Sequence, residues 1–258
     1  MKKIKTINFI KNWLLDYSVM SKTDGFVVGV SGGIDSAITS TLCAMTKKKV
    51  ICASLPIKKN KTQIELSQNH ISWLKNNYPQ VEEIKIDLTK TYETLNFALP
   101  FKKNNNLSLA NLKSRLRMVS LYFLASTNNL LVAGTGNKVE DFGIGFYTKY
   151  GDGGVDISPI ADLTKTEVYK LAKELKIIKT IQDSEPTDGL WDDFRTDEDQ
   201  IGASYKEIEK IMEYIEKNSK RKLNKREQKV LNIYKNFHSK NLHKMNPIPV
   251  CEIPNNLR

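Results

Sequence analysis

The chain has 258 residues, an ordinary hydrophobic fraction of 40% and a formal net charge of +11. Such a length can bury a sizeable core in one large domain. No apolar run approaches the ~20 residues of a membrane-spanning helix, so the sequence argues against a membrane protein. The three cysteines, Cys43, Cys52 and Cys251, are too few and too far apart for a disulfide framework or a metal cluster. These features predict a reduced, cytoplasmic protein with its thiols in the core.

The positive charge is concentrated near the C-terminus. Residues 217–244 contain ten Lys or Arg and one acid, whereas residues 183–199 contain eight acids and one base. A basic segment suggests an anionic partner, either nucleic acid or a small molecule that carries phosphate. A solvated, lysine-rich surface is the alternative for the same composition.

In chain order, the first 17 residues have helically spaced apolar side chains and predict an amphipathic helix rather than an export signal. Short apolar runs then alternate with segments of helical periodicity. The predicted strands are at 25–30, 49–56, 81–87 and 130–135. The predicted helices are at 34–47, 61–78, 89–99 and 108–127. Asp162 or Thr164 is expected to cap one more helix, which ends near residue 175.

Strands that alternate with helices indicate a parallel sheet covered on both faces, so we expect an open, doubly wound α/β fold. The sequence has no internal repeat and no proline-rich linker. We therefore expect one domain over residues 1–258. Its core spans about 1–182, and an acidic lid and basic C-terminal helices occupy about 183–258.

The stretch GVSGGIDS, residues 29–36, comes directly after the first predicted strand. In such sheets, ligands bind beyond the carboxyl ends of the strands. Gly32 and Gly33 allow the backbone to approach an anion closely. Successive N–H groups and the start of the next helix then form a nest for phosphate, to which Ser31 and Ser36 can add hydroxyl donors. The stretch is neither a GxxxxGK[ST] loop nor a GxGxxG pattern.

Asp35 is the unusual member of this stretch. A carboxylate repels phosphate, so its presence suggests a divalent cation that bridges the two. SGGxDS in this position resembles the pyrophosphate loop of the ATP pyrophosphatases, which cleave ATP to AMP and pyrophosphate to adenylate a substrate. The resemblance implies ATP and Mg²⁺. The residues that it assigns to ATP here are Gly29, Val30, Ser31, Gly32, Gly33, Ile34, Asp35 and Ser36.

Further motifs narrow the resemblance to one family. Residues 111–118, NLKSRLRM, resemble the NxxxRxRM helix of NAD synthetase, and residues 134–140, GTGNKVE, resemble its GTxNxxE stretch. The block FYTKYGDGGVDISPIADLTK at 146–165 resembles the most recognisable part of that family. SEPTDGLW at 184–191 and HK at 243–244 complete the order. The short, ammonia-dependent form of the family is expected, because no glutaminase domain precedes the loop.

The resemblance implies a ligase that converts deamido-NAD, ATP and ammonia to NAD, AMP and pyrophosphate through an adenylated nicotinate carboxylate. This is the last step of NAD biosynthesis. It also implies a cytoplasmic homodimer without nucleic-acid or membrane partners, and the helices at 1–17 and 108–127 are candidate interface elements. Two rival interpretations are a tRNA-modifying adenylating enzyme and a nucleotide sensor. The chain lacks the CxxC that tRNA thiolases usually need, and a sensor would need neither the two carboxylates nor the GDGG block.

Two carboxylates match the family's Mg²⁺ ligands, Asp35 and Glu140, which are hard oxygen donors. The sequence between Glu140 and the TKYGDGG block is one residue longer than in common bacterial members, so Asp141 is an alternative to Glu140. Counting from Thr135 favours Glu140. The remaining residues that the resemblance assigns to ATP are Thr135, Lys165 and Thr187.

Two residues are assigned to catalysis by the same resemblance. Lys165 would act as a point charge on phosphate, and Asp152 would lie near the reacting carboxyl group. We expect Asp152 to orient ammonia or to take its proton, since ammonium must lose a proton before it can attack. An aspartate in a glycine-rich turn is the structural alternative. The residues assigned to deamido-NAD are Arg115, Lys149, Asp156, His243 and Lys244, of which Arg115, His243 and Lys244 could also be plain surface charges.

Overall fold

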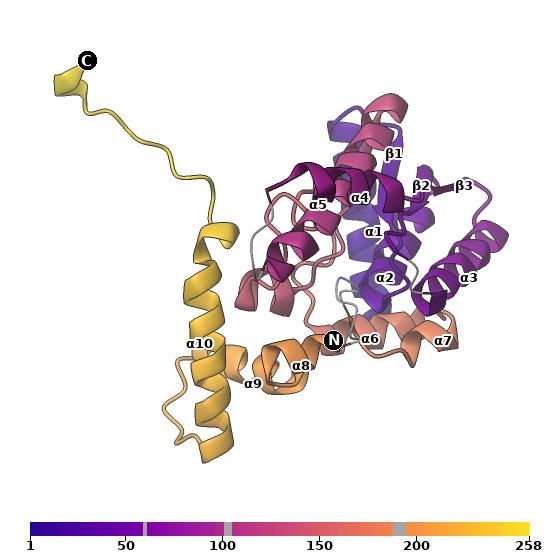
Figure 1. Ribbon diagram of the computed structural model, residues 1–258. Coiled ribbons are helices and arrows are strands. Elements are labelled where there is room, and N and C mark those ends of the chain that lie inside the picture. The colour runs from indigo at the N-terminus through magenta and orange to yellow at the C-terminus, as the bar shows by residue number, and fades with distance from the viewer. Residues whose placement is uncertain (59–60, 101–104, 188–194) are drawn as a thin grey trace.

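The computed structural model describes residues 1–58, 61–100, 105–187 and 195–258 (Figure 1). Four strands pair in parallel in the order β3-β2-β1-β4, which confirms the predicted parallel α/β fold. The strands are β1 (Gly25–Gly29), β2 (Lys49–Ser54), β3 (Val81–Lys85) and β4 (Leu130–Val132). Each lies within a predicted strand and ends before it does, because the last residues of each predicted segment turn into the loops at the carboxyl edge.

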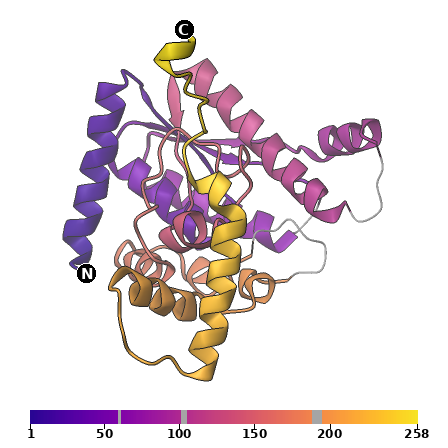
Figure 2. The same cartoon turned by 90° about the vertical axis from the view of Figure 1, so that its left-hand side faces the viewer.

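Helices cover both faces of the sheet, as expected (Figure 2). The helices on the first face are α1 (Lys3–Met20), α2 (Ile34–Met45), α3 (Lys61–Asn77) and α6 (Lys165–Glu174). The helices on the second face are α4 (Thr89–Ala98) and α5 (Asn106–Asn128). Along β1, Phe26 and Val28 pack toward the first group and Val27 toward the second. Successive residues of a strand face opposite sides, so a strand buried on both faces is apolar throughout.

Thr164 rather than Asp162 is the N-cap of α6. Its side chain accepts a hydrogen bond from the Glu167 N–H, and the Glu167 carboxylate accepts one from the Thr164 N–H. This reciprocal capping box satisfies two of the N–H groups that a helix start leaves unpaired. The cap fixes where the helix begins and therefore fixes Lys165, its first residue.

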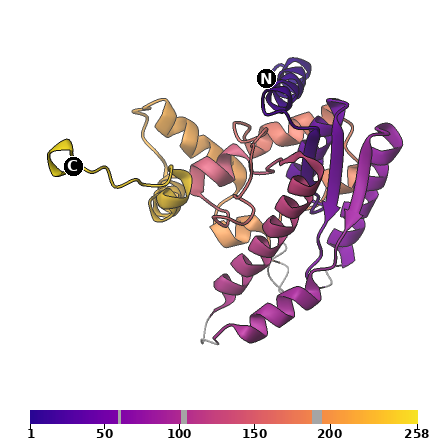
Figure 3. The same cartoon turned by 90° about the horizontal axis from the view of Figure 1, so that it is seen from above.

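The C-terminal part contains α7 (Lys179–Gln182), α8 (Asp197–Ile201), α9 (Tyr205–Glu216), α10 (Lys225–Met245) and the short 3-10 helix η2 (Asn255–Leu257). Helices α9 and α10 share an apolar cluster with the π-helix η1 (Val139–Ile144). Helix α10 packs against both α9 and η1, and residues 246–258 extend away from the body (Figures 1 and 3). The division near residue 182 stays a prediction, and residues 188–194 of the expected lid lie outside the described residues.

Two of the three thiols are in the core, as predicted. Cys43 and Cys52 are buried, but Cys251 is exposed because it lies in the extended C-terminal segment. The prediction of core thiols is therefore wrong for Cys251. In the part of the chain that the structure describes, no helix is both long and apolar enough to cross a membrane.

Candidate active site

The turn between β1 and α2 is held from behind by α3. The Ser67 hydroxyl donates a hydrogen bond of 2.6 Å to the Val30 carbonyl. Gly32 has a φ of +92°, and a Cβ atom at this position would lie 2.7 Å from the Gln63 carbonyl oxygen. Both the dihedral angle and the close packing therefore require glycine here. Gly33 has an ordinary φ of −84° and is the N-cap of α2.

The two serines of the turn bond to each other and to its backbone. The Ser31 hydroxyl lies 3.1 Å from that of Ser36 and accepts a bond of 3.1 Å from the Gly33 N–H. The Ser36 hydroxyl donates to the Gly33 carbonyl at 2.9 Å. These contacts define the shape of the turn. The predicted role of the serines as phosphate donors would require at least part of this network to exchange partners.

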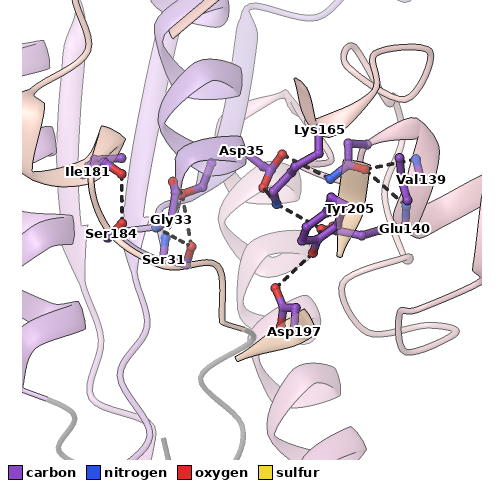
Figure 4. Close-up of polar contacts among 12 residues, drawn as sticks. Ser31, Gly33, Asp35, Val139, Glu140, Lys165, Ile181, Ser184, Asp197 and Tyr205 are labelled. Carbon is purple, nitrogen blue, oxygen red and sulfur yellow. Dashed lines mark hydrogen bonds and ion pairs between the residues drawn. The ribbon is translucent and has the colours of Figure 1, made fainter. Parts of the chain in front are cut away.

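A lysine and two carboxylates from three different elements meet at this turn (Figure 4). The Lys165 ammonium lies 2.6 Å from Asp35 Oδ2 and 3.0 Å from Glu140 Oε1. The Lys165 side chain is 4% exposed, and each carboxylate side chain is 16% exposed. Burial alone would lower the pKa of Lys165, but the two carboxylates outweigh it and raise that pKa, so the lysine is a cation. Burial also opposes ionisation of Glu140, yet Lys165 and Tyr205 lower its pKa.

Glu140 lies on the π-helix η1, which Asn137 anchors. The Asn137 side-chain oxygen accepts bonds from the N–H groups of Val139 (3.1 Å) and Glu140 (3.2 Å), and its amide nitrogen donates to Asp35 Oδ1 at 3.2 Å. A π-helical turn contains one residue more than an α-helical turn would. It lies in the region where the sequence predicts one extra residue. Of the two alternative acids, Glu140 shares a cation with Asp35, whereas Asp141 lies against Gly136.

A tyrosine and an aspartate from the C-terminal part complete the cluster. The Tyr205 hydroxyl donates to Glu140 Oε1 at 2.5 Å and lies 3.2 Å from Asp197 Oδ2. Burial and the neighbouring carboxylates raise the pKa of Tyr205 far above its usual range, so its hydroxyl keeps its proton. Neither residue was predicted. Tyr205 lies in none of the sequence motifs. Asn137 was not singled out either, but it lies inside the GTGNKVE stretch, so that motif could have indicated it.

Helix α10 fastens the segment that follows Glu140. Three of its side chains bond to carbonyl groups within residues 143–147, at 2.7–2.9 Å: His238, Asn241 and Lys244. The Lys244 ammonium reaches two of these carbonyls, at 2.7 Å each. Part of the basic C-terminal segment therefore has a structural role in addition to any role in binding.

A cavity of about 300 Å³ opens at the carboxyl edge of the sheet. Most residues predicted to bind ATP line it together: Gly29, Val30, Ser31, Gly33, Ile34, Asp35, Ser36, Thr135, Lys165 and Thr187. Gly32 is the exception, because it packs against α3 behind the turn. Glu140 and Asp152 also line the cavity. The two predicted metal ligands and both predicted catalytic residues thus share one space.

Asp152 is held in place by α5 and its own turn. Its Oδ1 accepts hydrogen bonds from the Ser114 hydroxyl (2.6 Å) and from the Thr148 N–H (3.0 Å). The residue is open to solvent on one side, but the protein packed around its carboxylate raises its pKa. Ser114 was not singled out by sequence reasoning, although it lies inside the NLKSRLRM motif.

The residues predicted to bind deamido-NAD lie outside the lining of this cavity. The Arg115 guanidinium donates to the Lys149 carbonyl at 3.2 Å, and the Lys149 ammonium donates to the His243 carbonyl at 2.7 Å. This chain of contacts brings α5, the GDGG loop and α10 together. Asp156 is held separately, since its carboxylate accepts bonds from the Tyr122 hydroxyl (3.0 Å) and the Val132 N–H (2.8 Å).

In the described part of the chain, no group of three or more His, Cys, Asp or Glu side chains could hold a metal ion alone. Asp35 and Glu140 nevertheless both approach one ammonium within 3.0 Å, which demonstrates that they can converge on a single cation. Two carboxylates and the phosphates of a bound substrate together form a set of oxygen ligands that suits Mg²⁺. The residues therefore fit the predicted ion, provided that a bound nucleotide supplies the remaining ligands.

A parallel sheet with a glycine turn after its first strand, facing two carboxylates and a lysine, defines a class of enzyme that binds nucleotide phosphates at a strand end. The chain belongs to the NAD synthase family, whose sequence pattern matches residues 6–248.

Relatives agree with this family assignment. The NH(3)-dependent NAD(+) synthetase of Malacoplasma penetrans is 39% identical over 219 residues, which cover 83% of this chain and 85% of that protein. The NMN synthetase of Francisella tularensis, a solved structure, has a TM-score of 0.85 and 31% identity over 99% of both chains. The NH3-dependent NAD synthetase of Campylobacter jejuni, solved with a nitrate ion, has a TM-score of 0.81 and 27% identity over 98% of this chain and 100% of that one.

Proposed function

We propose that the protein amidates deamido-NAD with ammonia, at the expense of ATP, to give NAD, AMP and pyrophosphate. The observation that carries this proposal is the convergence of Asp35, Glu140, Lys165 and Asp152 on the cavity beside the SGGxDS turn. Membership of the NAD synthase family and relatives named NH(3)-dependent NAD(+) synthetase support the acceptor and the nitrogen donor.

The chemistry requires that the acceptor carboxylate be activated. A carboxylate does not react with ammonia, because it is negatively charged and its oxygen is a poor leaving group. Attack of the nicotinate carboxylate on the α-phosphorus of ATP forms an acyl adenylate and expels pyrophosphate. The protein accelerates such a step mainly by positioning the groups and by neutralising charge.

The residues of the turn bind the phosphates that leave. The residues at the start of α2 and Lys165 line the cavity, where the helix N-terminus and the ammonium favour the negative charge that grows on pyrophosphate. Lys165 now pairs with Asp35 and Glu140. We expect its ammonium to turn from these carboxylates toward phosphate when Mg-ATP binds. Mg²⁺, held by Asp35 and Glu140, would supply charge neutralisation across the phosphates.

Asp152 serves the second half of the reaction. Ammonium loses a proton before its nitrogen can attack the acyl carbon, and AMP then leaves. A carboxylate in the cavity both attracts ammonium and accepts that proton. The raised pKa of Asp152 brings it closer to that of a useful base at neutral pH. The two donors to its Oδ1 keep the carboxylate oriented.

Deamido-NAD is proposed to bind along Arg115, Lys149, Asp156, His243 and Lys244. Because these residues lie outside the cavity lining, an extended dinucleotide would run from the cavity toward α5 and α10. We also propose a homodimer. Val119 and Phe123, four and eight residues after Arg115 on α5, are 58% and 65% exposed and form an apolar stripe beside these residues. The cytoplasmic location and the absence of nucleic-acid partners stay predictions.

A second candidate acceptor is nicotinate mononucleotide. The likeness to an NMN synthetase over 99% of both chains favours it. The activated carboxylate is the same in both acceptors, so the turn, Lys165 and Asp152 would serve either one. The two differ only in the adenylate half, which we expect to lie along the proposed deamido-NAD residues, outside the cavity lining.

The test is direct. The purified chain is incubated with Mg-ATP, ammonium and either deamido-NAD or nicotinate mononucleotide, and NAD, NMN, AMP and pyrophosphate are quantified. We expect equimolar NAD, AMP and pyrophosphate, with a higher kcat/KM for deamido-NAD than for the mononucleotide. The D35N variant is the matched control and should form neither NAD nor NMN. Release of ADP instead of AMP, or AMP formation that depends on tRNA, would refute the proposal.

A further inference from the structure

A buried tyrosine from outside the core contacts the proposed metal ligand Glu140. Tyr205 is the first residue of α9 and is only 4% exposed. Its hydroxyl donates to Glu140 Oε1 at 2.5 Å, and the Lys165 ammonium lies 4.7 Å from the centre of its ring (Figure 4). A single side chain thus touches both the proposed ligand and the lysine that pairs with it.

Tyr205 is fixed by the starts of two helices. Ser204 caps α9 in a reciprocal capping box with Glu207, and the Tyr205 N–H donates to Glu198 of α8 at 2.9 Å. The hydroxyl also lies 3.2 Å from Asp197, the first residue of α8. Because its backbone N–H and its hydroxyl are both held, the hydroxyl has a defined position in front of Glu140.

Glu140 needs such a partner, because a glutamate side chain has three rotatable bonds and only one productive orientation toward a cation. Its Oε1 accepts bonds from both Lys165 and Tyr205. When the Lys165 ammonium turns to phosphate, as proposed above, the first of these bonds is lost. The bond from Tyr205 then remains to keep the carboxylate directed toward Asp35.

We propose that Tyr205 is a positioning residue for Glu140, whose carboxylate it orients toward the divalent cation that accompanies ATP. The inference rests on the proposed metal-ligand role of Glu140. Groups that orient the direct ligands of a metal are typically worth 10–100-fold in metal affinity or activity. Tyr205 is neither among the residues that line the cavity nor among those proposed to bind deamido-NAD, so its loss should leave the affinity for deamido-NAD unchanged.

The test uses Mn²⁺ as the metal and α,β-methylene-ATP, which cannot be cleaved between its α- and β-phosphates. Calorimetry gives the dissociation constant of this nucleotide with EDTA and with saturating Mn²⁺, and the ratio is the metal enhancement. In Y205F, which keeps the ring and its packing, we expect that enhancement to fall at least tenfold while binding in EDTA is unchanged. The kcat for NAD formation should fall with KM for deamido-NAD constant. The matched control is Y234F, which changes a partly buried tyrosine of α10 and should behave as wild type.

A double-mutant cycle with E140Q separates positioning from a general loss of structure. E140Q should also reduce the metal enhancement, and Y205F should cost little more in the E140Q background. The inference would be overturned if the metal enhancement of nucleotide binding were unchanged in Y205F. It would also be overturned if the losses of the two single variants multiplied in the double variant. If E140Q alone had no effect, the ligand role of Glu140 would fail and that of Tyr205 with it. Formation of NAD by the wild-type chain tests the proposed reaction separately.

Discussion

Replacement of Lys165 by methionine tests whether this lysine neutralises the two carboxylates in the absence of ligand. The side chain is 4% exposed, and its ammonium contacts Asp35 and Glu140 at 2.6 and 3.0 Å. Methionine has a similar length but no charge, so K165M leaves two poorly solvated carboxylates beside each other. Removing one partner from a buried ion pair typically costs about 3–5 kcal/mol of the free energy of unfolding. We expect a loss of that size at pH 8.

The destabilisation by K165M should depend on pH in a defined direction. Without the ammonium, the folded-state pKa of Glu140 should rise above its unfolded value, and that of Asp35, which burial already raises, should rise further, because burial and mutual repulsion favour the protonated forms. A carboxylate with a raised folded-state pKa destabilises the fold at high pH, and the penalty disappears as the pH falls through that pKa. The difference between K165M and wild type should therefore shrink from pH 8 to pH 5.

Urea unfolding followed by circular dichroism at the two pH values measures this difference. The control is K138M, because Lys138 is 29% exposed and its partner Glu216 is 56% exposed. An exposed pair of this kind is worth at most about 1 kcal/mol. A K165M penalty below 1 kcal/mol, or one that is equal at pH 8 and pH 5, would refute the role assigned to Lys165.

Three further predictions concern the turn, the base and the core. G32A should destabilise the fold by about 1–3 kcal/mol, since φ is +92° and a Cβ would crowd Gln63, whereas G33A should cost less in the same unfolding assay; equal costs would contradict this. D152N should lower kcat roughly 10²–10⁴-fold with an unchanged circular dichroism spectrum, because an amide oxygen still accepts both hydrogen bonds; full turnover would exclude a base. Burial lowers the pKa of His70 from 6.5 to about 4, so the neutral side chain contributes a share of the free energy of unfolding. This share is fully present above pH 6.5 and should be lost as the pH falls toward 4. That share is roughly 3 kcal/mol, and stability curves of wild type and H70Q that run parallel from pH 7 to pH 4 would disprove it.

The parallel sheet was predictable because three of its strands, β1, β2 and β4, lie in short apolar runs that alternate with helix-like segments. Burial on both faces makes such strands apolar throughout, and the segments between them have helical periodicity. The edge strand β3 is polar at three of its five positions and largely exposed. The position of the SGGxDS turn at the carboxyl edge was predictable because the turn follows the first strand, and its role as an anion site stays a prediction. The family motifs then selected residues that the structure brings to one cavity, including Asp35, Glu140, Asp152 and Lys165.

The contacts between side chains far apart in the sequence were not predictable. Tyr205 is 65 residues from Glu140, and a tyrosine at a helix start is unremarkable in a single sequence. The pairing of Lys165 with two acids depends on the positions of three separate elements, which no local pattern encodes. Likewise, Lys244 lies in a basic segment that suggests an anionic partner, yet its ammonium is held by carbonyl oxygens.

The attachment of α10 to residues 143–147 has a genetic consequence. A premature stop codon within α10 would leave the sheet and the glycine turn intact, but it would release residues 143–147, the segment that follows Glu140. Loss of only the extended residues after Asn246 would spare every one of those bonds. Stop codons within α10 should therefore abolish the activity, whereas stop codons after Asn246 should leave a functional enzyme.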